Sequence, residues 1–362
     1  MRRPTLLLLF VLLAAPAAQA GDAELLAAQQ RYLAPVLKRY PDSPDGAQAR
    51  YDAGRELVEA VVAAGTVRPG LRPLRQRLLA RGRAQVAHAE ELDRDPGFRS
   101  GAPLAPLPRA GKGYGPRRPD ASLARRLASA AAPVEGAAGI WVHEVDSGRY
   151  AGYHAEQRFA AASTVKLGAL VAALRVSPRP ERSPWWYDVR QLGFWSSNLA
   201  ANRIYAGLGH VAVTDGLRRL GMSSSTYPGE YRATTAWAPP GPHTRVTTAG
   251  DLGRALYRLH AAAHGDARAL RLLGLTRRGA ALGLRVLASA QPVGDNAGLL
   301  RRWLPGATLA EKNGWLTDTR TSAAIVYRGG RATIVVVELY RPGVTRAEAA
   351  RLGRAVLRAV FG

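Results

Sequence analysis

Cysteine is absent from all 362 residues of the chain, and methionine occurs only twice. Without thiols the protein can form no disulfide scaffold, thiolate zinc site or iron–sulfur cluster. A cysteine nucleophile and a lipid-modified N-terminal cysteine are excluded for the same reason. Hydrophobic residues make up 47% of the chain, which is enough for a sizeable core and too much for a disordered tail.

Lysine is scarce as well, since only four of the 51 basic residues are lysines and the other 47 are arginines. The formal charge of +24 first suggests a nucleic-acid partner. A nucleic-acid binder, however, clusters its basic residues in one stripe, whereas these arginines are scattered through nearly every segment, as a codon-composition bias would produce. We expect no nucleic-acid partner, and only a weak, general attraction to anionic envelope surfaces.

Long apolar runs are also few. Arg2 and Arg3 precede an apolar stretch over residues 6–15, and Ala18-Gln19-Ala20 fits a small-x-small cleavage pattern. The alternative is a membrane anchor, but this stretch is short for a membrane span, and no later segment has 18 consecutive apolar residues. The sequence predicts a signal peptide over residues 1–20, cut after Ala20, and a periplasmic or secreted protein.

The rest of the chain divides by composition. Residues 21–100 carry apolar positions at helical spacing and hold no catalytic cluster, so they predict a helical extension that is structural or binds a partner. Residues 101–120 are rich in proline and glycine and predict a semi-extended linker. Residues 121–362 form the second domain. Helices of the extension are expected at 23–39, 46–64 and 71–92.

The second domain has predicted strands at both ends and helices between them. This order favours an α+β fold, in which an antiparallel sheet closed by the two ends is flanked by helices. Thr345 and Glu348 form a capping-box pattern for the last helix. The other expected elements are a helix at 122–131, strands at 139–145, 323–327 and 332–339, and a turn at 146–149.

Ser163 and Lys166 are the first candidate pair for chemistry. They precede the apolar run 167–174, which is typical of a buried helix. One helical turn separates them, so the lysine can reach the serine hydroxyl. A buried lysine can act as a base, which arginine cannot, and a serine becomes nucleophilic when a base takes its proton. The alternative is a capping serine with a solvated lysine.

Two further motifs are candidates for chemistry: one has a hydroxyl and an amide, and the other has a lysine and a glycine. Ser196 and Asn198 lie on one short turn, where they can relay a proton and hold a substrate amide; a helix N-cap is the alternative. Lys312 and Gly314 follow an extended segment, where the lysine can hold a substrate carboxylate and the glycine permits close approach. The alternative there is a surface turn.

The ordered set Ser-x-x-Lys, Ser-x-Asn and Lys-x-Gly is far more specific than any one of its members. It resembles the motif set of penicillin-recognising serine enzymes. Residues 121–362 are similar to the class A β-lactamase and D,D-peptidase superfamily. Residues 196–202, 247–252 and 305–315 of this chain also resemble segments of that superfamily. The resemblance implies the β-lactamase-like αβα sandwich.

The resemblance also implies roles. Ser163 would be the acylated nucleophile, with Lys166 as its base or proton relay, and Ser196 would pass a proton to the leaving nitrogen. Asn198 would hold the acyl-amide side chain. Lys312 would provide positive potential for the substrate carboxylate, and Asn313 and Gly314 would belong to the same substrate-binding segment. The main-chain N–H groups of Ser163 and Trp315 would form the oxyanion hole.

Three positions depart from the family pattern. Asn313 stands where the family has Thr or Ser, and Ser197 stands where it has Asp. Glu230 is the candidate deacylating base, although Thr234 occupies the place of its usual Asn partner and prolines follow at 239, 240 and 242. Deacylation by water needs such a base. Without it, the acyl-enzyme would be long-lived.

Three functions remain open at this point. The first is a class A β-lactamase-type hydrolase acting on small-molecule β-lactams, and the second is a D,D-carboxypeptidase or penicillin-binding protein acting on cell-wall peptides. The third is a catalytically idle binding domain. None requires a cofactor. His260 and His264 are four residues apart, but without a third ligand we predict no metal site.

Overall fold

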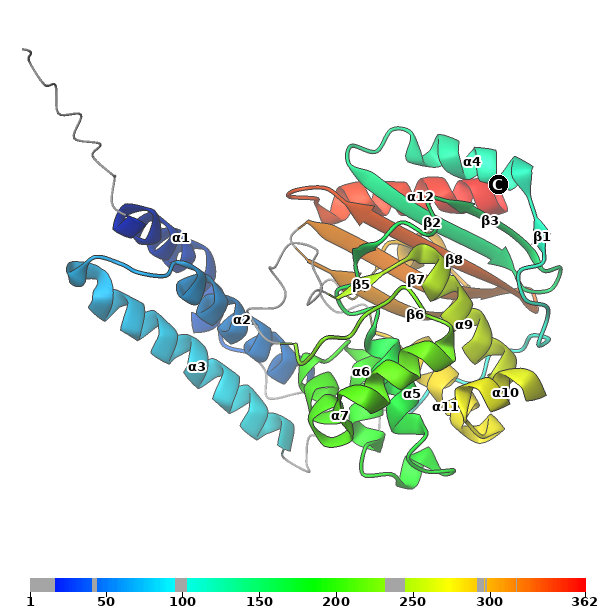
Figure 1. Ribbon diagram of the computed structural model, residues 1–362, viewed down its shortest axis with the longest axis horizontal. Helices are drawn as coiled ribbons and strands as arrows, with labels where there is room; N and C mark the ends of the chain where they lie inside the picture. Colours follow the sequence, from blue (N-terminus) through cyan, green and yellow to red (C-terminus); the bar gives the residue numbers. More distant parts are fainter. Residues whose placement is uncertain are drawn as a thin grey trace, which may run out of the picture.

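The computed structural model describes residues 17–40, 44–94, 103–231, 245–291, 296, 298–316 and 318–362. Figure 1 shows three long helices at one side of a larger part, in which a twisted sheet lies between two groups of helices. Among the described residues, no helix combines the length and the apolar character needed to cross a membrane. The predicted signal peptide lies largely outside these residues, and its cleavage stays a prediction.

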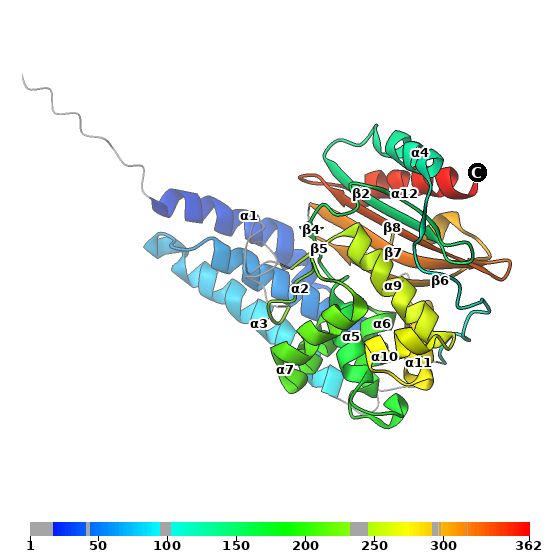
Figure 2. The same cartoon turned by 45° about the vertical axis from the view of Figure 1, so that its right-hand side comes forward.

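The helical extension contains α1 (Ala17–Leu37), α2 (Pro44–Ala63) and α3 (Arg72–Arg94). The three helices lie side by side in both views (Figure 2). Leu25, Leu57 and Leu78, one from each helix, are buried in a common apolar cluster. A Cβ on Gly54 would lie 2.6 Å from the Gly82 carbonyl oxygen, so glycine lets α2 and α3 approach closely.

The main sheet has six strands in the order β1-β3-β2-β8-β7-β6. The first and last parts of the domain meet at its centre, because β2 pairs antiparallel with β8. All pairings are antiparallel except the short β1–β3 pair. The strands are β1 (Arg118–Pro119), β2 (Ala137–Glu144), β3 (Arg149–Tyr153), β6 (Thr308–Trp315), β7 (Thr319–Arg328) and β8 (Arg331–Tyr340).

Both faces of the sheet are covered, as the alternation of side chains along the strands requires. On β8, Val335 packs in the cluster shared with α4 (Ala121–Ala131) and α12 (Arg346–Phe361). Its neighbour Val336 packs in the opposite cluster, which contains α5 (Lys166–Leu174) and α9 (Ala249–Ala263). The α+β class and the flanking helices predicted from the sequence are confirmed.

The second face carries the remaining helices. They are α6 (Trp186–Phe194), α7 (Asn198–Leu220), α10 (Ala267–Leu273) and α11 (Arg277–Ala288). A small two-stranded sheet pairs β4 (Phe159–Ala160) with β5 (Val246–Thr247) just before the α5 turn. At the end of the chain, the Thr345–Glu348 capping box forms as predicted and begins α12.

The proline-rich segment has neither helix nor strand over residues 103–115, and it lies against the domain. His264 Nε2 is 3.0 Å from the Pro108 carbonyl oxygen, and His260 Nε2 is 2.9 Å from the Gly111 carbonyl oxygen. Ala105 N–H donates to Ser289 Oγ at 2.7 Å. Side chains at the ends of α9 and α11 therefore hold this segment by its main-chain groups, a contact that no local pattern indicated.

Candidate active site

Ser163 lies in the turn that leads into α5. The turn is tightened by Thr164, whose N–H and hydroxyl both donate to the Ala161 carbonyl oxygen. Ala162 adopts a left-handed φ of 46°, an unusual conformation for a residue other than glycine. Lys166 is the first residue of α5, is 0% exposed, and places Nζ 3.0 Å from Ser163 Oγ.

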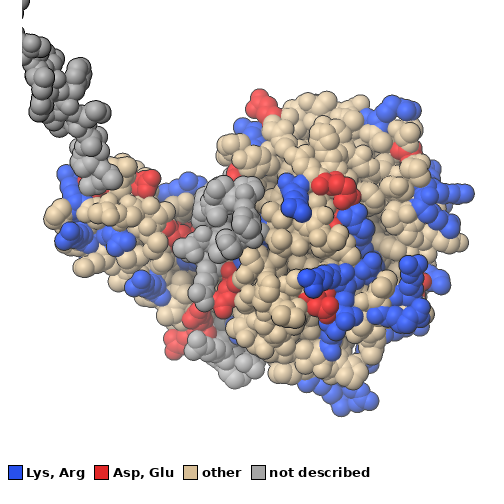
Figure 3. Space-filling view, viewed as in Figure 1, with Lys and Arg blue, Asp and Glu red and all other residues tan. Residues whose placement is uncertain are grey.

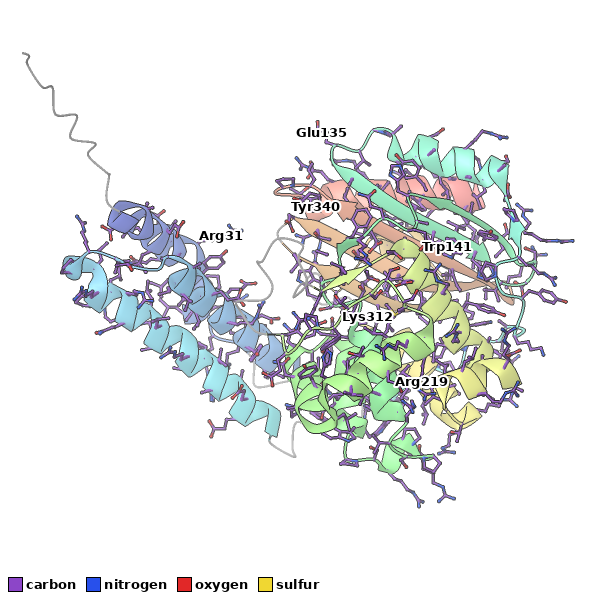
Figure 4. All side chains as sticks on the ribbon, in the orientation of Figure 1. Arg31, Glu135, Trp141, Arg219, Lys312 and Tyr340 are labelled. Atoms are coloured by element: carbon purple, nitrogen blue, oxygen red, sulfur yellow. The ribbon has the colours of Figure 1, made fainter. Side chains whose placement is uncertain are left out.

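A second lysine reaches the same place from the sheet. Lys312 on β6 donates from Nζ to Ser196 Oγ at 2.6 Å, and Lys166 Nζ donates to the Ser196 carbonyl oxygen at 2.5 Å. Ser196, which joins α6 to α7, has a left-handed φ of 60°. Strained backbone of this kind is held where the surroundings over-determine it. Lys312 lies between the sheet and the helices of the second face (Figure 4).

Asn198 completes the polar centre at the start of α7. Its Oδ1 accepts a hydrogen bond from Lys166 Nζ at 2.6 Å. Its Nδ2 donates to the carboxylate of Asp52 on α2, at 3.2 Å. Ser197 beside it is an ordinary N-cap that accepts from Ala200 N–H. The capping role that the sequence left open for this segment is therefore performed by Ser197, while Ser196 and Asn198 face the two lysines.

Burial changes the acid–base behaviour of both amines. Burial holds the pKa of Lys166 well below its usual value, and the positive charge of Lys312 lowers it further, while Asp52 opposes the shift. Burial lowers the pKa of Lys312 to about 7, with Glu311 acting in the opposite direction. A neutral Lys166 amine 3.0 Å from Ser163 Oγ can accept the hydroxyl proton.

Strand β6 lies close against the turn that contains Ser163. A Cβ on Gly314 would be 3.1 Å from Ser163 N and 3.0 Å from the Ala161 carbonyl oxygen. Trp315 is the next residue and is half-buried. Asn313 alternates away from this turn, because its side chain bonds to Ser322 Oγ and the Asn296 carbonyl oxygen. Its amide is therefore engaged on the opposite side of β6 from Lys312 and Gly314.

Glu230 belongs to a loop that meets the site through its neighbour. Tyr231 is buried beneath Lys166, with Nζ 4.2 Å from the ring centroid, and its hydroxyl donates to the Ala162 carbonyl oxygen at 3.0 Å. Burial raises the pKa of Tyr51 on α2, and the negative charge of Glu230 adds to this shift, so Glu230 lies near the Tyr51 side chain. Thr234 and the three prolines of this loop lie outside the described residues.

Three residues of the site were missed by the sequence analysis: Asp52, Tyr231 and Arg245. Arg245 is buried, donates to the Gly229 carbonyl oxygen at 2.6 Å, and lies 3.9 Å from the Tyr231 ring centroid. Asp52 comes from a segment that showed no catalytic pattern. The available signal for Tyr231 was its position next to Glu230, but nothing local indicated which of the two side chains faces Lys166.

Neither a metal nor a cofactor is indicated by the side chains of the site. Among the described residues, no three His, Asp or Glu side chains come together in a way that could hold a metal ion. His260 and His264 instead bind main-chain carbonyl oxygens of the proline-rich segment. His260 Nδ1 also lies 2.8 Å from the Tyr327 hydroxyl.

The beta-lactamase enzyme family model matches residues 122–179 and 188–360. The match spans most of the chain and includes every predicted site residue. It leaves out the helical extension. The chain belongs to this family, and the resemblance inferred from the motifs is confirmed.

Solved structures share the fold. A β-lactamase from Desulfarculus baarsii has a TM-score of 0.55 and 21% identity, covering 67% of this chain and 98% of its own. PBP-A has a TM-score of 0.54 and 20% identity, covering 72% of this chain and 98% of its own. A class A β-lactamase from Mycobacterium abscessus has a TM-score of 0.54 and 22% identity, covering 66% and 100%. No curated protein matches the chain.

Proposed function

We propose that this chain is a serine hydrolase that opens β-lactams through an acyl-enzyme on Ser163. The contact that carries the proposal is the 3.0 Å approach of Lys166 Nζ to Ser163 Oγ, made by a buried amine whose pKa is depressed. An ordinary capping serine with a solvated lysine would not bury the amine. Membership of the beta-lactamase enzyme family agrees with this chemistry.

The acylation step uses the two lysines in sequence. Ser163 Oγ attacks the lactam carbonyl carbon, its proton passes to Lys166 Nζ, and the ring carbon–nitrogen bond breaks. The leaving nitrogen takes a proton from Ser196 Oγ, which is 2.6 Å from Lys312 Nζ and is reprotonated from the lysines. Ser163 N–H lies beside β6, where with the Trp315 N–H it would bind the oxyanion.

A second candidate is a penicillin-binding D,D-peptidase whose acyl-enzyme is hydrolysed slowly. The observation that favours it is the position of Tyr231, the neighbour of Glu230, whose aromatic ring lies against Lys166. Glu230 lies near Tyr51 of α2, where its charge adds to a pKa rise caused chiefly by burial. Rapid hydrolysis by this site requires Glu230 to reach the acyl carbonyl through one water.

One experiment separates these functions. The protein and its Ser163→Ala variant are incubated with a fluorescent penicillin and, separately, with a chromogenic cephalosporin. We expect covalent labelling of the parent protein and none of the variant, because the label is attached to Ser163 Oγ. Rapid cephalosporin turnover identifies a β-lactamase, and stable labelling without turnover identifies the penicillin-binding alternative.

Two outcomes test the details. If neither reagent reacts with the parent protein, the hydrolase proposal is wrong and the idle binding domain remains. If a Glu230→Gln variant turns over as fast as the parent, Glu230 is not the deacylating base. The Ser163→Ala protein should keep its circular dichroism spectrum, which confirms that lost labelling reflects lost chemistry.

A further inference from the structure

The helical extension reaches into the candidate active site. Tyr51 of α2 is buried against Leu199 of α7 and Ala89 of α3, and its hydroxyl lies 3.3 Å from Asn202 Nδ2. One residue further along α2, Asp52 Oδ1 accepts a hydrogen bond from Asn198 Nδ2 at 3.2 Å. An apolar contact and two polar contacts thus join the extension to the helix that carries Asn198.

We propose that Asp52 is a positioning residue of the active site, supplied by the extension, which holds Asn198 and Lys166 in their reactive arrangement. The proposal rests on the proposed function, because it assigns the reacting groups to Ser163 and Lys166. It extends that function to a part of the chain outside the family match. The extension then belongs to the catalytic unit and is more than a spacer.

The geometry explains how Asp52 acts through Asn198. The amide has one oxygen and one nitrogen, and with Nδ2 directed at the carboxylate its Oδ1 must face Lys166 Nζ, at 2.6 Å. A flipped amide would place its NH2 group against an amine and its oxygen against a carboxylate. Asp52 therefore selects the orientation in which Asn198 accepts a hydrogen bond from Lys166.

The charge of Asp52 has a second effect, because cations outnumber anions around Lys166. Lys312 from β6, Arg245 before β5 and Arg55 from α2 all lower the pKa of Lys166, and Asp52 raises it. In the part of the chain that the structure describes, Nζ also contacts neutral groups: the Tyr231 ring, Ser163, Ser196 and Asn198. Asp52 thus offsets part of the repulsion that these cations exert on a protonated Lys166.

The scarcity of lysine permits a test without substrate. Lysine labelled at Cε with carbon-13 gives four side-chain signals, from Lys38, Lys112, Lys166 and Lys312. Loss of one signal in Lys166→Met assigns Lys166. We expect Asp52→Asn to lower the pKa of Lys166 by about one unit, since an opposite charge nearby has been removed.

The matched control is Glu24→Gln, which removes an exposed carboxylate from α1 of the same extension. It should leave the titration of Lys166 unchanged. An unchanged titration in Asp52→Asn, or an equal shift in Glu24→Gln, overturns the proposal.

Kinetics separates positioning from charge. Asp52→Asn keeps an oxygen that accepts a hydrogen bond from Asn198 but loses the negative charge. The acidic limb of the plot of acylation rate constant against pH should therefore move to lower pH, with little change in the maximal rate constant. Asp52→Ala loses both, so the maximum should also fall, by about tenfold. Equal maxima in the two variants would exclude the positioning role.

These results distinguish the two proposals. A parent protein that does not label with penicillin contradicts the proposed function, while the lysine titration still decides whether Asp52 acts on Lys166. If the parent protein labels normally and the pH profiles of Asp52→Asn, Asp52→Ala and Glu24→Gln are all identical to its own, only the role of Asp52 is contradicted.

Discussion

Lys166 and Lys312 are both buried, yet their surroundings differ. Lys166 is surrounded by cations, whereas Glu311 next to Lys312 supports its positive charge. Their pKa values therefore separate, with that of Lys166 held well below the usual value and that of Lys312 near 7. This separation is what an acylating site needs: one neutral amine as base and one ammonium to attract a carboxylate.

The first residue-scale prediction concerns Lys312. Its ammonium form predominates below pH 7, so attraction of the β-lactam carboxylate should be lost as pH rises through about 7. We expect the second-order rate constant for acylation of Ser163 to fall above that pH. Lys312→Arg keeps a cation at all these pH values and should remove the fall. A fall of the same size in the arginine variant would exclude Lys312 as its source.

Asn313 illustrates how one strand position can change a residue's role. The motif predicted that Asn313 binds substrate. In the structure, the alternation of side chains along β6 directs its amide to Ser322 and Asn296 instead. The residues on either side, Lys312 and Gly314, face the turn that contains Ser163. Carboxylate binding by the Asn313 side chain therefore requires it to leave these two partners.

At the scale of the element, β6 acts as a wall for the turn that contains Ser163. Its close approach requires a residue without a side chain, since a Cβ at Gly314 would be 3.1 Å from both Ser163 N and Ala162 Cβ. The turn is itself held by the Tyr231 hydroxyl and by Thr164. Small shifts of β6 should therefore appear directly as misplacement of Ser163.

The element-scale prediction follows from this packing. Gly314→Ala should push β6 away from the turn and slow acylation of Ser163 by about a hundredfold, the size expected for a displacement near 1 Å. Gly70→Ala is the control, because a Cβ there meets nothing within 4 Å. Labelling with fluorescent penicillin measures both variants. If Gly314→Ala labels at the parent rate, the close approach of β6 to the Ser163 turn does not control acylation.

At the scale of the whole molecule, segments remote in sequence hold one another. His260 of α9 lies between the Tyr327 hydroxyl on β7 and the Gly111 carbonyl oxygen of the proline-rich segment. Asp52 of α2 joins the extension to α7. Lys and Arg side chains lie at several places on the visible face, with acidic side chains among them (Figure 3).

The whole-molecule prediction concerns pH and stability. Burial lowers the pKa of His260 from 6.5 to about 4, so the unfolded chain takes up a proton in this range that the folded chain does not. His260 therefore contributes a fall in the free energy of unfolding as pH is lowered from 6.5 toward 4, while Glu56, whose pKa burial raises to about 7, contributes in the opposite direction. Urea denaturation at several pH values measures this slope.

The control compares two histidines. His260→Gln should remove the contribution of His260 to the slope, while buried His143, whose pKa is lowered in the same direction, keeps its own contribution. His88→Gln changes a histidine that is 45% exposed on α3 and should leave the slope unchanged. An undiminished slope in His260→Gln would assign the pH dependence to other groups.

The motif order and the apolar patterning determined, from sequence alone, the α+β class, the flanking helices, the Thr345 cap and the family. These features are local, since alternation, capping and short motifs are set by neighbours along the chain. Ser163 and Lys166 could be paired for the same reason, because they lie three residues apart at one helix start.

Tertiary structure decided the rest. Asp52 and Asn198 are 146 residues apart in sequence, and no periodicity relates a helix of the extension to the start of α7. The choice between Glu230 and Tyr231 as the neighbour of Lys166 depended on how Asn202 and Arg245 bind that loop. Burial of both lysines, and with it their lowered pKa values, arises only when helices and sheet close over the site.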